Sequence, residues 1–135
     1  MTRFKVTFLA LVLAQAAHST EEYLGRLYEV FAPARFVSGL ITQDLERGFL
    51  IFNAALVLFG LWCFLWPVRH QWPSAVPLAW LWVAIELGNG VGHSLWSLRQ
   101  LRYTPGVVTA VILLIISLNL MRQLRGQKSA RRAPP

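Results

Sequence analysis

Two histidines and three glutamates have the types and spacing from which chemistry can be expected. His18, Glu21 and Glu22 stand in the stretch HSTEE, and residues three or four positions apart lie on one face of a helix. Glu86 and His93 are seven positions apart, which places them nearly in register on a second helix. Imidazole and carboxylate groups from facing helices hold zinc or a di-iron pair in helical bundles. The spacing therefore predicts a site built from histidine and carboxylate side chains.

Three interpretations of these residues follow from general chemistry. A zinc ion or an iron centre finds enough ligands among His18, Glu21, Glu22, Glu86 and His93. Without a metal, a buried carboxylate with a raised pKa, Glu21 or Glu86, acts with a histidine in acid–base catalysis on a lipophilic substrate. Alternatively, the histidines and glutamates pair across the helices and only hold them together.

Further polar residues are expected near the same site. The candidates for substrate binding are Asn53, Asn89, Arg99, Arg102 and Thr109. The arginines suit a phosphate or carboxylate head group, or else an anchor at the membrane interface. The asparagines suit a ligand or a bridge between helices. Gln15 and Asn119 lie at other depths, so we expect them to stand apart from the site.

The chain that must position these residues is too apolar for an ordinary soluble domain. Of its 135 residues, 56% are hydrophobic and only 14% are charged. Four apolar segments, residues 4–23, 49–66, 75–98 and 106–121, are each near the ~20 residues that a helix needs to cross a ~30 Å hydrocarbon layer. Nothing in them alternates like a barrel strand. The expected fold is an all-α membrane protein, a four-helix transmembrane bundle.

The connection between the first two spans predicts a further helix. Phe36, Val37, Leu40 and Ile41 recur at helical spacing beside polar residues. This pattern is typical of an amphipathic helix that lies on the membrane surface. Such a helix is either a lid packed on the bundle or a gate for a substrate.

In an up-down-up-down bundle, the ends of odd spans and the starts of even spans lie at the same membrane face. The candidate residues occupy those parts of their spans, so they fall within about 15 Å of one surface. An ionisable side chain inside the membrane costs roughly 2.5–3.5 kcal/mol even on the lenient insertion scale. Five such side chains at one depth therefore favour a site.

Charge orients the chain and limits its partners. The net charge of the chain is +7. Because basic residues are concentrated at the C-terminal end, we expect a transmembrane domain at residues 1–121 and a basic disordered tail at residues 122–135. Basic residues are in excess on the side of both termini, which the positive-inside rule places in the cytoplasm. The location expected is the inner (plasma) membrane, with the lipid bilayer as a partner. No nucleic-acid partner is expected, because the basic residues are not interleaved with base-stacking aromatics.

Residues 1–17 also resemble a secretory signal peptide, with a basic start, an apolar middle and Ala14-Gln15-Ala16 as a cleavage signal. The helical pattern continues beyond this point up to Pro33. We therefore expect the segment to remain in the protein as its first span.

The stretch of residues 18–22 resembles the signature of the HXXEE family of small bacterial integral membrane proteins. Asn53, then Asn89 with His93, and the stretch RYTPGVVTAV at residues 102–111 resemble the remaining marks of that family in order and spacing. The resemblance covers nearly all of the chain except the basic tail. It implies a metal-ligand set made of His18, Glu21, Glu22 and His93. It implies no substrate, and the case for Glu86 rests on spacing alone.

From these residues we expect a membrane-embedded metalloenzyme, a hydrolase or an oxidoreductase, that acts on a lipid or another hydrophobic molecule. The alternatives are a metal-free acid–base enzyme, a small ion- or proton-coupled transporter, and an accessory subunit of a larger membrane complex. Transport by so short a chain requires a homo-oligomer.

Overall fold

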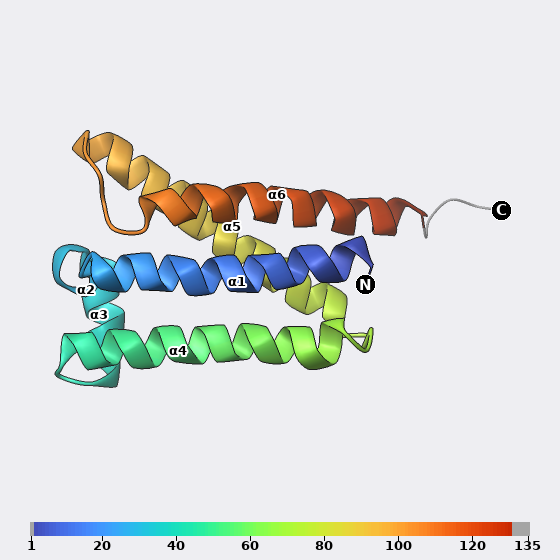
Figure 1. Cartoon of the computed structure of the whole chain (residues 1–135), viewed down its shortest axis with the longest axis horizontal. Helices are drawn as coiled ribbons and strands as arrows, with labels where there is room; N and C mark the ends of the chain where they lie inside the picture. Colours follow the sequence, from blue (N-terminus) through green and yellow to red (C-terminus); the bar gives the residue numbers. More distant parts are fainter. Residues whose placement is uncertain (1, 131–135) are drawn as a thin grey trace.

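The computed structural model describes residues 2–130, and their side chains as far as residue 126 (Figure 1). The four long helices are α1 (Arg3–Leu24), α4 (Leu45–Cys63), α5 (Ala75–Gln100) and α6 (Val107–Ala130). Two short helices, α2 (Leu27–Val30) and α3 (Ala32–Ile41), lie in the first connection, and the π-helical turn η1 (Phe64–Val68) continues α4. No strand occurs within the described residues. The prediction of an all-α chain is confirmed.

Three of the long helices are apolar and long enough to cross a membrane. They are the segments Leu45–Val68, Ala75–Gln100 and Val107–Gly126. With 22 residues, α1 is long enough by itself, but polar side chains in its second half lower its hydropathy. Three candidate spans support the prediction of a membrane protein. The fourth expected span, α1, is not among them, so the four-span bundle stays a prediction.

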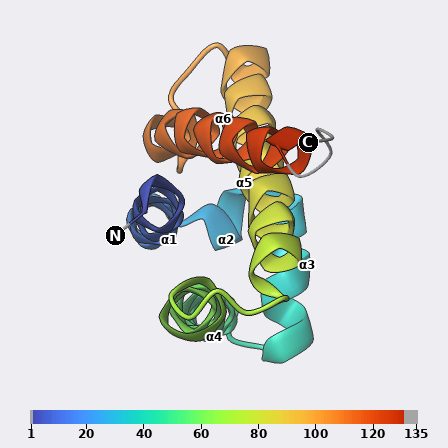
Figure 2. The ribbon, with the colours of Figure 1, turned by 90° about the vertical axis from the view of Figure 1, so that its right-hand side faces the viewer.

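The long helices are arranged with α1 in the middle. It packs against α4 on one side and α6 on the other, and α5 packs on α6 while crossing behind the group (Figure 1). Seen after a turn of 90°, α1 and α4 are viewed nearly end-on and α5 crosses them steeply (Figure 2). The start of α1 and the described end of α6 lie at the same end of the molecule.

Local signals in the sequence set the helix boundaries. The chain leaves α1 at Gly25 and turns at Arg26, whose φ of 54° is left-handed, so the helix does not continue to Pro33 as expected. Pro33 lies in the first turn of α3, where its missing N–H is not needed. Asp44 caps α4 by accepting a hydrogen bond from the backbone nitrogen of Arg47 at 3.1 Å.

The helix expected between the first two spans is present as α3. Phe36 and Leu40 are 67% and 70% exposed, so the apolar side predicted to face lipid is open to the surroundings. On the opposite side Ser38 is buried against α4, where a Cβ on Gly48 would come within 2.2 Å of the Ser38 carbonyl oxygen. Glycine at this position therefore lets α3 lie directly on α4. The position of α3 on a membrane surface stays a prediction.

The apolar core fills the half of the molecule that contains the described ends of the chain. Phe8 and Trp82 are fully buried there, in a cluster that contains residues of all four long helices. A smaller cluster lies in the other half and consists of Leu27, Tyr28 and Phe49. The polar side chains of α1, from Gln15 to Glu22, lie between these two clusters along the helix.

The last helix continues beyond the boundary expected for the membrane domain. The predicted basic tail begins at residue 122, whereas α6 runs through Ala130. Gln123 donates a hydrogen bond to the Thr7 hydroxyl at 2.9 Å, and Leu124 is buried, so this stretch is tied to the start of α1. Residues 131–135 of the predicted tail lie outside the described residues.

Candidate metal centre

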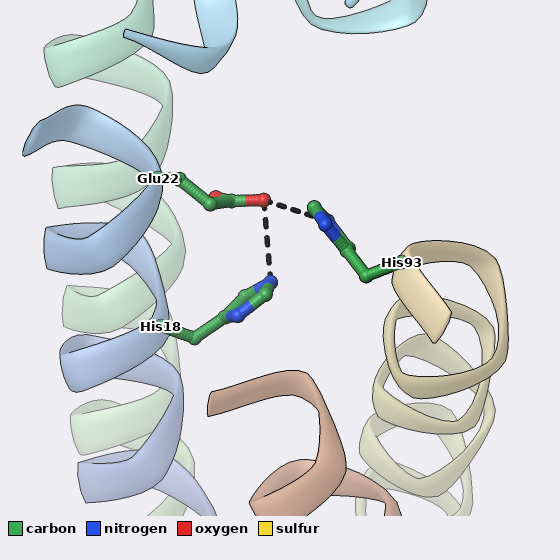
Figure 3. A group of neighbouring side chains, drawn as sticks. All are labelled: His18, Glu22 and His93. Atoms are coloured by element: carbon green, nitrogen blue, oxygen red, sulfur yellow. Dashed lines mark ion pairs between the residues drawn. The ribbon is translucent and has the colours of Figure 1, made fainter. Parts of the chain in front are cut away.

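Helices α1 and α5 bring His18, Glu22 and His93 together, and we call these three residues the His/Glu group (Figure 3). His18 and Glu22 lie one turn apart on α1, and His93 faces them from α5. The Oε1 atom of Glu22 is 3.2 Å from Nε2 of His18 and 3.0 Å from Nε2 of His93. One ligand atom from each residue lies within 4.8 Å of the other two.

The His/Glu group is shielded from the surroundings. The exposed fractions of His18, His93 and Glu22 are 0%, 7% and 8%. The two imidazole rings meet edge to face with their centroids 4.8 Å apart, and the rings of Phe31 and Trp96 lie beside His93. In such a dry setting an ionised carboxylate requires a positive partner, either a protonated imidazole or a metal ion.

Glu21, a further predicted ligand, is not part of the His/Glu group among the described residues. Its carboxylate accepts hydrogen bonds from the backbone nitrogens of Val108 and Thr109, at 3.2 and 2.8 Å. It also accepts from the hydroxyls of Thr109 and Tyr103, at 2.5 and 2.9 Å. The two N–H groups belong to the first turn of α6, whose positive dipole end favours a carboxylate. Glu21 therefore caps α6 from a neighbouring helix.

The loop before α6 strengthens this contact. Desolvation, followed in size by the hydrogen bond to Glu21, raises the pKa of the Tyr103 phenol. The hydroxyl therefore stays protonated and donates a hydrogen bond to the Glu21 carboxylate. A Cβ on Gly25 would come within 2.5 Å of the Pro105 side chain, so only glycine permits this approach. The end of α1 and the loop of residues 101–106 are thus packed tightly together.

The Thr109 hydroxyl determines which nitrogen of His18 carries a proton. A carboxylate can only accept, so Thr109 donates its hydrogen to Glu21, and its oxygen accepts from Nδ1–H of His18 at 2.8 Å. The Nε2 atom of neutral His18 then keeps its lone pair. This buried atom has no hydrogen-bond partner among the described residues, although it lies close to the Glu22 carboxylate. A lone pair oriented in this way by a second group is typical of a metal-binding histidine.

Gly106 leaves space for both imidazole rings. Its φ is +90°, a backbone conformation that favours glycine. A Cβ at this position would lie 2.8 Å from Cε1 of His93 and 2.9 Å from Cε1 of His18. The Pro-Gly pair that opens the last helix therefore also shapes the His/Glu group.

Glu86 is fully buried on α5 and orients two amide side chains. The Asn89 amide donates to its Oε2 at 3.1 Å. With its nitrogen facing Glu86, the Gln15 amide donates to Oε2 and Oε1 at 2.9 and 3.1 Å, and its oxygen accepts from Ser19. Gln15 was expected to stand apart, but it joins this network. The signal was present in the sequence, because positions 15, 19 and 22 follow one another at helical spacing.

A cavity of about 360 Å³ adjoins the His/Glu group. Its polar lining residues are Gln15, Glu22, Ser38, Asn53, Asn89 and His93. Two predicted substrate-binding residues, the asparagines, are thus placed beside it. The two carboxylates expected to act on a substrate, Glu21 and Glu86, do not line it, whereas Glu22 does.

The three other candidates for substrate binding lie elsewhere. Thr109 contacts His18 and Glu21 instead of the cavity. Arg99 and Arg102 are exposed at the end of α5 and do not reach the cavity. Their roles as head-group ligands or interface anchors stay predictions.

Comparison with known proteins identifies one family. A family model described as a protein of unknown function with an HXXEE motif matches residues 9–120. No curated protein and no solved structure matches the chain. The matched region contains the whole His/Glu group, Glu21 with its partners on α6, and the residues around the cavity.

Proposed function

Because the chain belongs to the HXXEE family, we propose from the geometry of its histidines and glutamates that it is a membrane protein with an intramembrane zinc or iron site. We further propose that the site is enzymatic and acts on a lipid or another hydrophobic molecule. The observation that carries the proposal is the meeting of two buried imidazoles and one buried carboxylate, with Nε2 of His18 and Nε2 of His93 at 3.2 and 3.0 Å from the same Glu22 oxygen.

The donor set fits a transition metal. Two imidazole nitrogens and one carboxylate oxygen are three protein ligands of the kind found in catalytic zinc sites, which leave a further position for water or substrate. The separations of 3.0 and 3.2 Å from the Glu22 oxygen are close to the roughly 3.3 Å between neighbouring ligands around tetrahedral zinc. The ligand set that this geometry supports is His18, Glu22 and His93, with Glu21 as a supporting residue.

We propose that α1 is a fourth membrane span. Its length corresponds to about 33 Å at ~1.5 Å per residue, and it lies alongside α4 and α6. The polar residues that lower its hydropathy, such as Gln15 and His18, are buried inside the protein. Val6 and Leu13 on its outer side are about half exposed and apolar. The helix therefore presents a lipid-compatible surface despite its polar content.

Both termini are expected in the cytoplasm of a bacterial cell, with the chain in the inner membrane. The end of the molecule at which the described chain starts and finishes carries Arg3, Lys5, Arg69, Arg122 and Arg125. A phosphatase reporter fused after Pro135 should be inactive and a cytoplasmic fluorescent reporter active. The opposite pattern would reverse the orientation and leave the site itself unaffected.

The residues of the site have different roles. Glu22 and His93 line the cavity and would contact a bound substrate. Thr109 orients His18, and Glu86 orients the amides of Asn89 and Gln15. A bound zinc or iron ion would supply a Lewis acid, and iron also redox chemistry, beside an apolar cavity. Zinc favours a hydrolase and iron an oxidoreductase, so identifying the metal selects the reaction class.

The proposal is tested by measuring metal content. Protein purified without chelators and equilibrated with zinc or ferrous iron is expected to hold about one ion per chain by elemental analysis. Bound metal should also raise the melting temperature, because an ion that binds only the folded state stabilises it by about 2.7 kcal/mol at a hundredfold excess over its dissociation constant. Protein that takes up neither ion would contradict the metal site and leave the metal-free acid–base alternative.

Replacing Thr109 by valine keeps the volume of the side chain and removes its hydroxyl. We expect metal affinity to fall about 10- to 100-fold, because the group that orients His18 is lost. The control is Thr109→Ser, which keeps the hydroxyl and should bind metal like the parent. Competition with a chelating dye measures both affinities, and equal affinity in the valine variant would contradict the role assigned to Thr109.

A further inference from the structure

We propose that the cavity beside the His/Glu group binds a single long hydrocarbon chain with one polar end, a fatty acyl group. This inference deepens the proposed function. It rests on that function in one respect, the expectation that the polar end of the chain lies beside Glu22 and His93. The occupancy of the cavity by a chain does not depend on a bound metal. The two ideas can therefore fail separately.

The cavity wall is mostly apolar. Six of its side chains are Leu27, Phe31, Val37, Phe49, Leu56 and Ile85. Its volume of about 360 Å³ is near the lower end of the range for small-molecule pockets. Such a space accommodates one acyl chain and excludes a whole two-chain lipid.

Two of the amides on the wall, Asn53 and Gln15, bond to protein groups. Asn53 accepts from the Ser19 hydroxyl at 2.7 Å and donates to the Phe49 carbonyl at 3.1 Å. The Gln15 amide nitrogen faces Glu86, and its oxygen lies 3.0 Å from the Ser19 hydroxyl oxygen. The other polar side chains on the wall are Ser38, Asn89, Glu22 and His93. Glu22 and His93 are the two ionisable ones, so a ligand with one polar end can place it beside them.

The cavity is accessible from the side that a bilayer would cover. Phe52 lines the cavity and is also 43% exposed, so the cavity reaches the outer surface there. Helices α4 and α5 touch where the rings of Phe59 and Trp82 stack, and both helices are apolar enough to cross a membrane. The gap that the cavity occupies between them lies beyond this contact, towards the start of α4, where Phe52 lines it. Ala34 and Val37 of α3 line the cavity at the end of this gap. A hydrocarbon chain can thus enter laterally between α4 and α5.

The test compares two alanines of α3. Ala34 lines the cavity and Ala32 is exposed, so Ala34→Trp fills the cavity and Ala32→Trp is the matched control. Tritiated palmitic acid is titrated against the purified protein in detergent, with binding read by scintillation proximity. We expect saturable binding near one per chain in the parent and in Ala32→Trp, and at least tenfold weaker binding in Ala34→Trp. A cooperative thermal transition verifies that each variant is folded, and Leu56→Trp replaces Ala34→Trp if that transition is lost.

Competition identifies where the chain comes from. Displacement by phosphatidylcholine assigns it to one chain of a bilayer lipid, and displacement by methyl palmitate alone assigns it to a free fatty acid or its ester; both support the proposal. It is overturned if palmitic acid does not bind saturably, or if the cavity-filling variant binds it like the parent. Metal binding without palmitate overturns this inference alone, and palmitate binding without metal overturns the metal site alone.

Discussion

Replacing Glu22 by glutamine is expected to abolish metal binding, whereas the same change at the adjacent Glu21 is expected to leave the metal bound. The Glu22 carboxylate lies within 3.2 Å of both histidine nitrogens, so it is the residue that the two imidazoles share. Glutamine has nearly the same volume but no negative charge, and its amide is a poor ligand for zinc or iron. Elemental analysis of the Glu22→Gln protein should show metal at background level.

The matched control is informative because Glu21 has a different task. Its carboxylate accepts two backbone N–H groups of α6 and two hydroxyls, so Glu21→Gln weakens a helix cap. We expect this variant to melt at a lower temperature by an amount that corresponds to about 1 kcal/mol, with close to one metal per chain retained. If both variants lose metal equally, the ligand set must include Glu21. If neither loses it, the His/Glu group does not hold the metal.

Replacing Gly106 by valine is expected both to destabilise the protein and to disturb the His/Glu group. The added Cβ would lie 2.8 and 2.9 Å from the rings of His93 and His18, and 3.0 Å from Cγ of Glu22. The φ of +90° is also strained for any β-branched residue. We expect a loss of about 3 kcal/mol in the free energy of unfolding, together with loss of metal from the displaced rings. Thermal unfolding in detergent and elemental analysis measure the two effects.

Gly88→Ala is the control for this prediction. Gly88 is exposed in the interior of α5, and a Cβ there meets nothing within 4 Å. Because alanine has a higher helix propensity than glycine, the variant should be as stable as the parent or more stable by up to about 1 kcal/mol. A Gly106→Val protein that melts like Gly88→Ala and keeps its metal would contradict the role of Gly106 as the space for the two imidazoles.

The exposure of Gly88 bears on a group of glycines in the sequence of α5. Gly88 and Gly92 form a small-xxx-small pair, and together with Gly90 they predict either close approach of a neighbouring helix or room for a bound group. In the structure both face open space, and the close approach of α6 occurs at Gly90, where a Cβ would lie 2.8 Å from Leu114. The pair is therefore free for a second chain or for lipid, and a homo-oligomer or a larger membrane complex stays a prediction.

The sequence by itself determined the helices and the face that His18 and Glu22 share. Apolar runs of about twenty residues predict spanning helices because backbone groups in lipid must bond within their own segment. The segments expected at residues 4–23, 49–66, 75–98 and 106–121 overlap α1, α4 with η1, α5 and α6, although α4 begins earlier than expected and α6 continues through Ala130. A spacing of four residues placed His18 and Glu22 one above the other, because the helical repeat is local geometry.

Only the tertiary structure decided which carboxylate does what. Glu21, Glu22 and Glu86 were all candidates for the same site in the sequence, yet Glu21 caps α6, Glu22 lies between two histidines and Glu86 faces two amides. These roles depend on how each helix is rotated about its axis and how closely its neighbour approaches, which is set by contacts such as those of Gly25 with Pro105 and of Gly106 with the imidazoles. These contacts join residues of different elements, such as Gly25 with Pro105 and Gly106 with His18, so no periodicity within one helix records them.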